Sequence, residues 1–340
     1  MRSQVKIIEK ESPGFVNNMD LAQERLGGKV LSCSDDFFAS SDNLIKPGRG
    51  IFIEDKFTER GKWMDGWESR RKRTPGNDWA IIKLGASGKI IGVDIDTNHF
   101  LGNHPPFAAI EAVNISGEVS IEDLENNVVN WTEILPKSPL DQGNHNFYEV
   151  GSNEVWTHLR LQIYPDGGVA RLKVYGEVYL DWNSVSNETE LDLASALNGG
   201  KSVLCNDMFF SHMDNLTMPG RGINMGDGWE TKRNRTPNNR DWIIVKLGHK
   251  GVLNKVLVDT CHFKGNYPDR CSLEGACIGP ENGQDLDSQH WESILPESKL
   301  KADNEHYFDD LQSTGPFTHV RMNIFPDGGI SRLRIFGSKA

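Results

Sequence analysis

The chain repeats its own sequence once, and this duplication limits what it can fold into. The run Asp65–Glu68 (DGWE) recurs at Asp227–Glu230, and the run Pro165–Gly168 (PDGG) recurs at Pro326–Gly329. Matched motifs keep their order and lie 160 to 172 residues apart. Solenoid repeats have units of about 20–50 residues, so this period is too long for one. The sequence therefore predicts two tandem copies of one whole domain.

The extent of the matching sets the predicted domain boundaries. We expect the first copy to span residues 19–176 and the second residues 191–337, with a linker at 177–190 and a lead-in at 1–18. The length of 340 residues agrees with this division, because a domain usually has about 100–200 residues.

Each copy is predicted to be all-β, in a jelly-roll β-sandwich. Residues 158–163 and 169–174 alternate polar and apolar side chains, which indicates half-buried strands. The PDGG run between them has turn chemistry, so they are expected to form a hairpin. Residues 81–84 and 90–95 predict two further strands, and only 21–26 and its counterpart 191–197 suggest a short helix. Many short strands with polar loops are typical of sandwiches.

Composition limits the partners and the location. The net charge of −11 would repel a phosphate backbone, so nucleic acid is not an expected partner. No stretch of about 18 apolar residues suggests a membrane span, and the first residues lack a signal-peptide pattern. Five cysteines without a CxxC pair indicate free thiols. We expect a cytoplasmic protein with no membrane partner.

The DGWE motif begins the first charged cluster that is repeated by identity. Arginine grips a carboxylate through two parallel hydrogen bonds, and a neighbouring carboxylate can act as a base or a metal ligand. The alternative is a salt-bridged loop capped by a core tryptophan. The candidates are Asp65, Glu68 and Arg71 in the first copy and Asp227, Glu230, Arg233 and Arg235 in the second.

The second cluster follows a strand and has the pattern Asp-Thr-x-His-Phe-x-Gly-Asn. A histidine can protonate a leaving nitrogen near neutral pH, and a nearby aspartate can orient it. A lone histidine is more often structural, but the repetition of the whole pattern favours function. The candidates are Asp96, His99 and Asn103 in the first copy and Asp259, His262 and Asn266 in the second.

The third cluster lies on one face of a predicted strand. His158, Arg160 and Gln162 are matched by His319, Arg321 and Asn323. This face either lines a pocket or is the wet side of the sheet. Nucleotide-loop, zincin and serine-nucleophile motifs are absent from the sequence. A divalent metal is left open, because ligands on separate loops leave no spacing signature.

The ordered and duplicated set of motifs resembles the allantoicase family from about residue 19 to residue 337. The resemblance implies tandem galactose-binding-like jelly rolls, a homo-oligomer and a hydrolase acting on carbon–nitrogen bonds in linear amidines. Its expected substrate is allantoate, which is converted with water to ureidoglycolate and urea in purine breakdown. Breaking that bond requires an acid for the departing urea and a base or metal to activate water.

Roles follow as a hypothesis for the second copy, although equivalent residues in the first copy leave that copy, or a site between the two, as alternatives. Arg233 and Arg235 bind the carboxylate, His262 is the acid, Glu230 or Asp259 activates water, and Asp227, Asn266 and Arg321 contact the rest of the substrate. The second copy is favoured because its histidine loop has Lys264 and Tyr267 where the first copy has Leu101 and His104. The first copy also inserts residues 55–64 before its DGWE motif.

Two other functions compete with hydrolysis. A tandem carbohydrate-binding module would stack exposed tryptophans on sugar rings, but Trp67, Trp79, Trp229 and Trp242 stand beside strand starts and are expected to anchor the core. The charged loops also suit an anion better than a neutral sugar. A purely structural interaction domain gives the repeated histidines and arginines no use.

Overall fold

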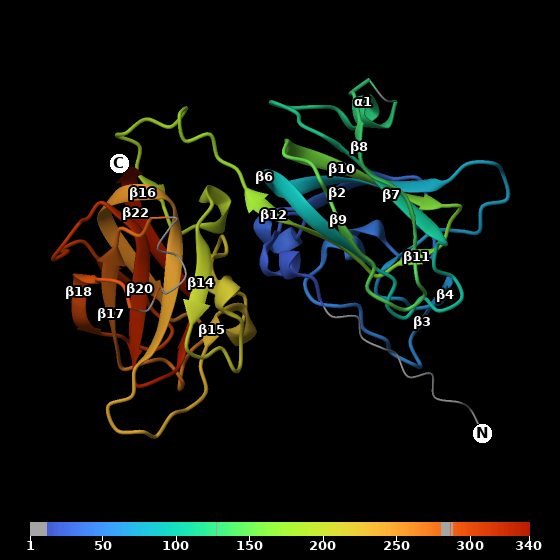
Figure 1. The fold of residues 1–340 in the computed structure, drawn as a ribbon. Helices are drawn as coiled ribbons and strands as arrows, with labels where there is room; N and C mark the ends of the chain where they lie inside the picture. Colours follow the sequence, from blue (N-terminus) through green and yellow to red (C-terminus); the bar gives the residue numbers. More distant parts are fainter. Residues whose placement is uncertain (1–11, 127, 280–285, 287) are drawn as a thin grey trace. The chain divides into compact units, whose positions relative to one another are not determined.

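The computed structural model describes residues 12–126, 128–279, 286 and 288–340. The chain divides into two compact units, Met1–Tyr179 and Leu180–Ala340, each with its own strands (Figure 1). The boundaries predicted for the two copies, 19–176 and 191–337, are not tested by this division and remain predictions. The last strand of the first unit ends at Val178, and the last strand of the second ends at Lys339.

The first unit is built on a sheet with the order β1-β12-β6-β10-β7-β8, and β2 and β9 also pair with β6. Its strands are β1 (Met19–Asp20), β2 (Lys29–Cys33), β6 (Asp78–Asp96), β7 (Phe107–Val113), β8 (Thr132–Pro139), β9 (Phe147–Glu149), β10 (Val155–Tyr164) and β12 (Arg171–Val178). Two small ribbons pair β5 (Trp67–Glu68) with β11 (Gly168–Val169) and β3 (Phe57–Thr58) with β4 (Gly61–Lys62). The helical pieces are η1 (Gly14–Asn17), η2 (Glu24–Leu26), η3 (Ser41–Ile45) and α1 (Ile121–Glu125).

The second unit repeats this plan, with the order β13-β22-β16-β20-β17-β18 and with β14 and β19 also paired to β16. Its strands are β13 (Leu191–Asp192), β14 (Lys201–Cys205), β16 (Asp241–Asp259), β17 (Arg270–Ala276), β18 (Glu292–Lys299), β19 (Glu305–Phe308), β20 (Phe317–Phe325) and β22 (Arg332–Lys339). A ribbon pairs β15 (Trp229–Glu230) with β21 (Gly329–Ile330), and the 3-10 turns are η4 (Ala196–Asn198), η5 (Met213–Thr217) and η6 (Met225–Asp227). The expected all-β tandem fold is confirmed.

One long strand in each unit connects the parts of the sandwich. The first half of β6 pairs with β2 and β10, and its second half pairs with β9 and β12. The hairpin predicted around PDGG is therefore wrong, because β10 and β12 both pair with β6 and not with each other. After the PDGG turn the chain forms β11, which pairs with β5. The next strand, β12, therefore does not form a hairpin with β10.

The predicted short helices are shorter than expected. Residues 21–26 form only the 3-10 turn η2 at Glu24–Leu26, after strand β1. Asp20 explains the early break, because its carboxylate accepts hydrogen bonds from the N–H groups of Ala22 (3.2 Å) and Val174 (3.0 Å). A side chain that binds nearby backbone donors in this way competes with helix formation.

Core positions follow the alternation of the strands. Leu159, Leu161 and Ile163 on β10 are fully buried. Trp67 and Trp229 are fully buried as expected. The expectation that Trp79 and Trp242 anchor the core is wrong. They are half-buried and lie opposite Gln162 and Asn323 in the strand register, on the polar face.

Within the described residues, no helix has the length and apolar character needed to cross a membrane.

Candidate functional site

A pocket of about 610 Å³ in the first unit collects candidates from separate loops. Glu68 comes from β5, and His99 and Asn103 come from the loop after β6. Arg60 and Lys62 come from the β3–β4 ribbon. The apolar part of the wall is formed by Phe38, Phe52, Met64 and Leu101. The arrangement places a carboxylate, an amide, an imidazole and two cations around one space.

Glu68 is held by its strand and by Asn103. Its neighbour Trp67 is fully buried, and Glu68 lies opposite Gly168 in the β5–β11 ribbon. The carboxylate accepts a hydrogen bond from the Asn103 amide at 2.7 Å. Burial raises the pKa of Glu68, although this hydrogen bond acts in the opposite direction. A raised pKa brings a carboxylate closer to the range in which a general base works well.

Gly168 explains part of the repeated PDGG motif. A Cβ there would lie 2.0 Å from the ring of Phe100, and one at its counterpart Gly329 would lie 1.9 Å from the ring of Phe263. Side chains cannot approach so closely, so these glycines allow the histidine loop to pack against the ribbon. Packing therefore explains the last glycine of the motif.

His99 has a left-handed backbone, with φ of 67°. Its ring stacks on Phe52, with 5.5 Å between ring centroids. Its ring nitrogens have no hydrogen-bond partner in the part of the chain that the structure describes, and the residue lines the pocket. The imidazole is therefore available to a ligand.

The two cations of this pocket lie in the segment that only the first copy has. The Lys62 ammonium is 4.8 Å from the Phe52 ring centroid and 4.7 Å from that of Phe57. Arg60 donates to the carbonyl of Phe37 at 3.0 Å. Among the described residues, neither cation forms an ion pair, so both charges can attract an anion. Comparison of the two copies did not identify these two cations as site residues, although the insertion at 55–64 was a signal that this part of the first copy differs.

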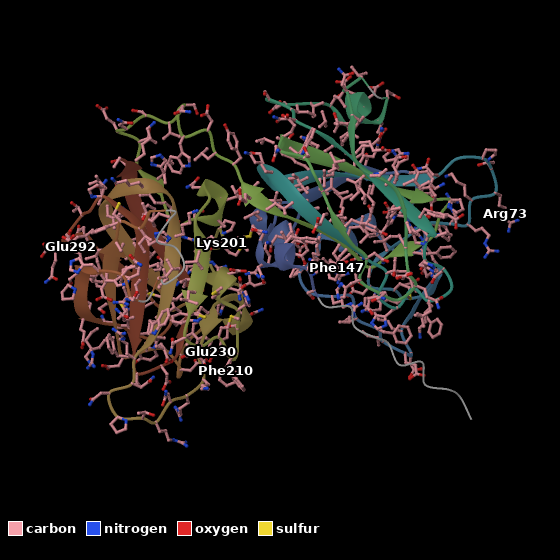
Figure 2. The ribbon with its side chains drawn as sticks, in the orientation of Figure 1. Arg73, Phe147, Lys201, Phe210, Glu230 and Glu292 are labelled. Carbon is pink, nitrogen blue, oxygen red and sulfur yellow. The ribbon has the colours of Figure 1, made fainter. Side chains whose placement is uncertain are left out.

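The second unit has a pocket of about 760 Å³ that brings together Glu230, Arg233, Arg235 and Asn266. Glu230 accepts a hydrogen bond from Asn266, and burial raises the pKa of Glu230. Phe210 also lines this pocket and lies next to Glu230 in Figure 2. The glutamate–asparagine pair is thus present in both copies.

His262 lies outside the residues that line the second pocket. Its ring Nε2 is 2.9 Å from the carbonyl oxygen of Gly222, to which it can donate. Asp259 also lies outside the pocket and is 1% exposed. Its carboxylate accepts two hydrogen bonds from Arg221, at 3.0 and 3.3 Å. The structure therefore does not bring these two candidates to Glu230.

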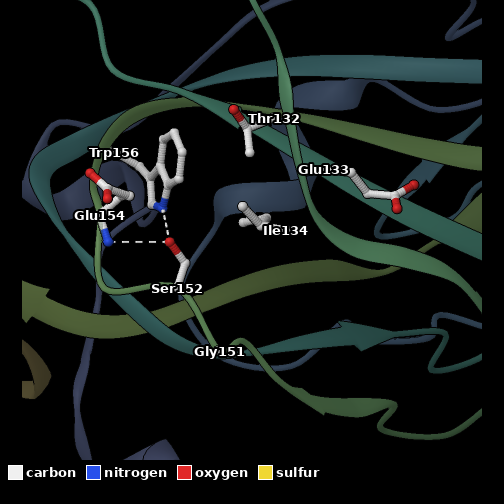
Figure 3. Close-up of a pocket in the computed structure, with 7 residues that line it drawn as sticks. All are labelled: Thr132, Glu133, Ile134, Gly151, Ser152, Glu154 and Trp156. Atoms are coloured by element: carbon white, nitrogen blue, oxygen red, sulfur yellow. Dashed lines mark hydrogen bonds between the residues drawn. The ribbon is translucent and has the colours of Figure 1, made fainter.

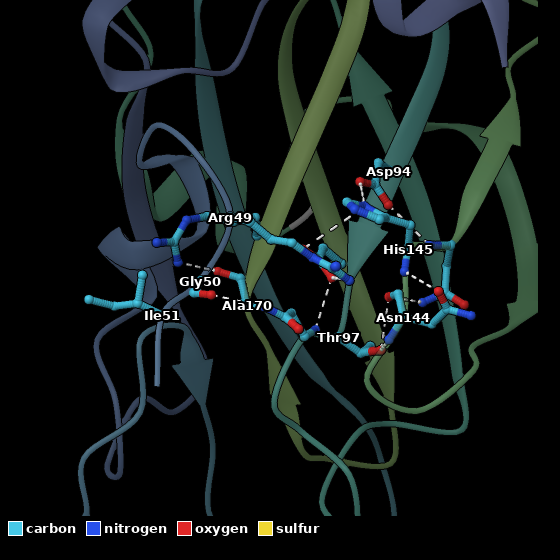
Figure 4. Close-up of polar contacts among 12 residues, drawn as sticks. Arg49, Gly50, Ile51, Asp94, Thr97, Asn144, His145 and Ala170 are labelled. Atoms are coloured by element: carbon cyan, nitrogen blue, oxygen red, sulfur yellow. Dashed lines mark hydrogen bonds and ion pairs between the residues drawn. The ribbon is translucent and has the colours of Figure 1, made fainter. Parts of the chain in front are cut away.

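The matching aspartate of the first copy has the same structural contacts. Asp96 accepts two hydrogen bonds from Arg49, at 2.9 and 3.2 Å. Figure 4 shows this region, in which Thr97 bonds to the Asn144 segment and His145 lies 2.5 Å from Asp94. The hydrogen bond to Asp94 raises the pKa of His145. This network fixes the start of the loop that carries His99.

Asp65 and Asp227 form ion pairs that hold the DGWE loops. Asp65 pairs with Arg171 at 2.8 Å, and Asp227 pairs with Arg332 at 2.9 Å. Both arginines are 3% exposed. Removing one partner of such a pair leaves a buried charge uncompensated, which explains why these residues match by identity. Arg71 is exposed and lies outside the lining of the first pocket.

The third cluster lies on the polar face of the sheets. Arg160 pairs with Glu111 at 2.7 Å and Arg321 pairs with Glu274 at 2.8 Å. Each guanidinium also lies over a tryptophan ring, Trp131 or Trp291, at 4.8 and 4.7 Å from the centroid. Burial lowers the pKa of His158, and that of His319 to about 4. These side chains line neither of the two pockets described above.

A third depression, of about 460 Å³, lies beside β8 in the first unit (Figure 3). Glu133, Glu154 and Trp156 line it, and Ser152 accepts a hydrogen bond from the Trp156 indole at 3.2 Å. It contains none of the candidate residues.

The described part of the chain has no group of three or more histidine, cysteine, aspartate or glutamate side chains placed to hold a metal ion. The side chains of the described residues therefore do not fit a metal centre.

The fold and its loops define a tandem-repeat β-sandwich protein with a charged pocket for a small molecule in each copy. The model of the allantoicase repeat matches residues 19–179 and 191–340. The chain is 50% identical over 329 residues to the protein named "Probable allantoicase" of Pseudomonas syringae pv. syringae (strain B728a), covering 96% of this chain and 98% of that protein. It is 48% identical over 332 residues to the "Probable allantoicase" of Pseudomonas aeruginosa (strain UCBPP-PA14), covering 97% and 98%.

Solved structures that are similar to this chain also include allantoicases. The allantoicase of Saccharomyces cerevisiae is 37% identical, with a TM-score of 0.78 and coverage of 95% of this chain and 94% of that one. Another structure, described as that of allantoicase, is 37% identical with a TM-score of 0.80 and coverage of 95% and 93%. The chain belongs to the allantoicase family.

Proposed function

We propose that the chain hydrolyses allantoate to ureidoglycolate and urea, which releases nitrogen from purine breakdown. Identity of about 50% to proteins named as allantoicases, over nearly the whole chain, supports this reaction. The chemistry of the first pocket also supports it. Allantoate carries one carboxylate and two ureido groups on a single carbon. Cations suit the carboxylate, and amide and carboxylate groups suit the ureido groups.

We place the reaction in the pocket of the first copy, which reverses the preference drawn from the sequence. The observation that carries this choice is that Glu68, His99, Asn103 and Lys62 line one pocket. The second pocket has the matching Glu230 and Asn266 without His262. A pocket that lacks the acid can bind the substrate but cannot assist the departure of urea in the same way.

Binding of the substrate follows from the charges of the first pocket. Lys62 and Arg60 attract the carboxylate, and the apolar wall strengthens this attraction because it lowers the local dielectric. The Asn103 amide nitrogen is directed to Glu68, so its oxygen can accept an N–H group of a ureido substituent.

The reaction exchanges one bond at the central carbon. Glu68 takes a proton from a water molecule whose oxygen bonds to this carbon, while the bond from the carbon to one ureido nitrogen breaks. His99 gives that nitrogen a proton, so urea leaves neutral. The proton held by Glu68 then passes to His99, which restores both side chains. The OH of the water ends in ureidoglycolate and its remaining hydrogen is balanced by the one that urea gains. Each proton transfer of this kind typically contributes about 10²–10⁴-fold to the rate.

We also propose that the protein is a cytoplasmic homo-oligomer without a nucleic-acid partner. Exposed apolar side chains support self-association, since Phe209, Phe210 and Ile223 are 69%, 61% and 74% exposed. Light scattering coupled to size-exclusion chromatography measures the mass directly.

The test of the function is urea release from allantoate by the purified protein. The wild-type protein is expected to release urea, and H99A is expected to lose about 10²-fold or more in kcat. The matched variant H262A is expected to retain kcat within about twofold, because His262 lies outside the second pocket. Absence of urea release by the wild-type protein overturns the function, and an active H99A with an inactive H262A overturns the choice of copy.

A further inference from the structure

The two histidine loops share a backbone but hold their rings differently. His99 and His262 have left-handed φ values of 67° and 69°. Each follows a residue that differs between the copies, Asn98 in the first and Cys261 in the second. Since the backbones agree, the cause of the different ring contacts lies in the neighbouring side chains.

A buried backbone carbonyl near each histidine needs a donor. In the first copy this carbonyl belongs to Gly50, and it accepts the Asn98 amide at 2.8 Å. In the second copy it belongs to Gly222, and the ring Nε2 of His262 lies 2.9 Å from its oxygen. The thiol of Cys261 lies 4.0 Å from the same oxygen and is a weak donor. A buried carbonyl without a partner is costly, so some side chain must supply the hydrogen bond.

We propose that Asn98 is a positioning residue for the reaction, which rests on the function proposed above. It satisfies the Gly50 carbonyl and so leaves the ring of His99 facing the pocket that contains Glu68. In the second copy the Cys261 thiol is only a weak donor at 4.0 Å, and the ring of His262 supplies the shorter hydrogen bond to the carbonyl. The His262 ring that bonds to this carbonyl lies outside the lining of the second pocket, so it is not placed to give a proton to a leaving group there. This one-residue difference, together with the inserted β3–β4 ribbon, separates the reacting first copy from the second copy.

The test is a double-mutant cycle on N98C and H99A, measured by urea release. N98C installs the residue of the second copy, and kcat is expected to fall at least about tenfold while KM changes by less than about twofold. If Asn98 acts through His99, N98C costs nothing further in the H99A background. An unchanged kcat in N98C overturns the proposal, and so does the same loss of kcat with and without His99.

The matched control is C261N, which is expected to retain kcat because the second pocket is not the reaction site. Nitrogen NMR of the histidine rings supplies a second readout for both variants. The ring N–H of His262 should lose its hydrogen bond in C261N, and that of His99 should gain one in N98C. If both rings keep their wild-type signals, Asn98 does not position the histidine. Loss of activity in H99A combined with full activity in N98C rejects this proposal alone, whereas full activity in H99A rejects the acid role on which it rests.

Discussion

Acidic residues that match by identity between the two copies have different roles, depending on their contacts. Asp96 and Asp259 match by identity because each binds an arginine through two hydrogen bonds while nearly fully buried. Glu68 and Glu230 match as well, but they line pockets, and within the described residues an asparagine amide is the one hydrogen-bond partner of each carboxylate. An ionised side chain is available for chemistry when its partners leave it exposed to a ligand. The glutamates meet this condition and the aspartates do not.

The proposed role of Glu68 as the general base predicts how the reaction depends on pH. A general base works in its ionised form, so activity falls as the pH drops through its pKa. Burial raises the pKa of Glu68, so this loss should occur above the ordinary glutamate value of about 4.3. The hydrogen bond from Asn103 lowers the pKa, so N103A should move the acid limb of kcat/KM to a higher pH. The matched variant N266A should leave the profile in place, and a shift of the N103A limb to lower pH would contradict the role of Glu68.

At the scale of elements, the sequence predicted strands better than their pairing. Alternation located the strand at 158–163, because the period of side chains along a strand is local information. The strand predicted at 169–174 is divided between β11 and β12, and the two strands predicted at 81–84 and 90–95 are one strand, β6. Alternation could not show that β6 lies between β10 and β12, because strand pairing depends on residues far apart in the chain. The duplication located Glu68, His99 and Asn103. It could not find Lys62, which has no counterpart in the second copy, or the different role of Asn98 and Cys261.

The β3–β4 ribbon carries Lys62, the cation proposed to attract the carboxylate of the substrate. K62Q removes the ammonium and keeps much of the length of the side chain. A hydrogen bond to a charged group contributes about 1.5–3 kcal/mol, so KM for allantoate should rise about tenfold or more with a smaller change in kcat. R235Q in the second pocket is the matched variant and should leave KM unchanged. Steady-state kinetics at fixed ionic strength measure both, and the reverse outcome would show that the carboxylate binds in the second copy.

The whole molecule carries two copies of one fold with unequal sites. Both copies keep the DGWE ribbon, the buried aspartate–arginine pairs and the glutamate–asparagine pair. Among the described residues, the first copy alone has the inserted ribbon with its two cations and a histidine that lines the pocket. The duplicated parts are therefore those that hold the fold and shape a pocket. Under the proposed function, the parts that differ decide which pocket reacts.

The most direct test compares the two glutamates. E68Q and E230Q make the same isosteric change at matching positions, so differences in folding cancel when circular dichroism agrees. The loss of a general base should lower kcat for urea release by about 10²-fold or more in E68Q, with E230Q within about twofold of the wild-type protein. A large loss in E230Q with full activity in E68Q would contradict the account and place the reaction in the second copy.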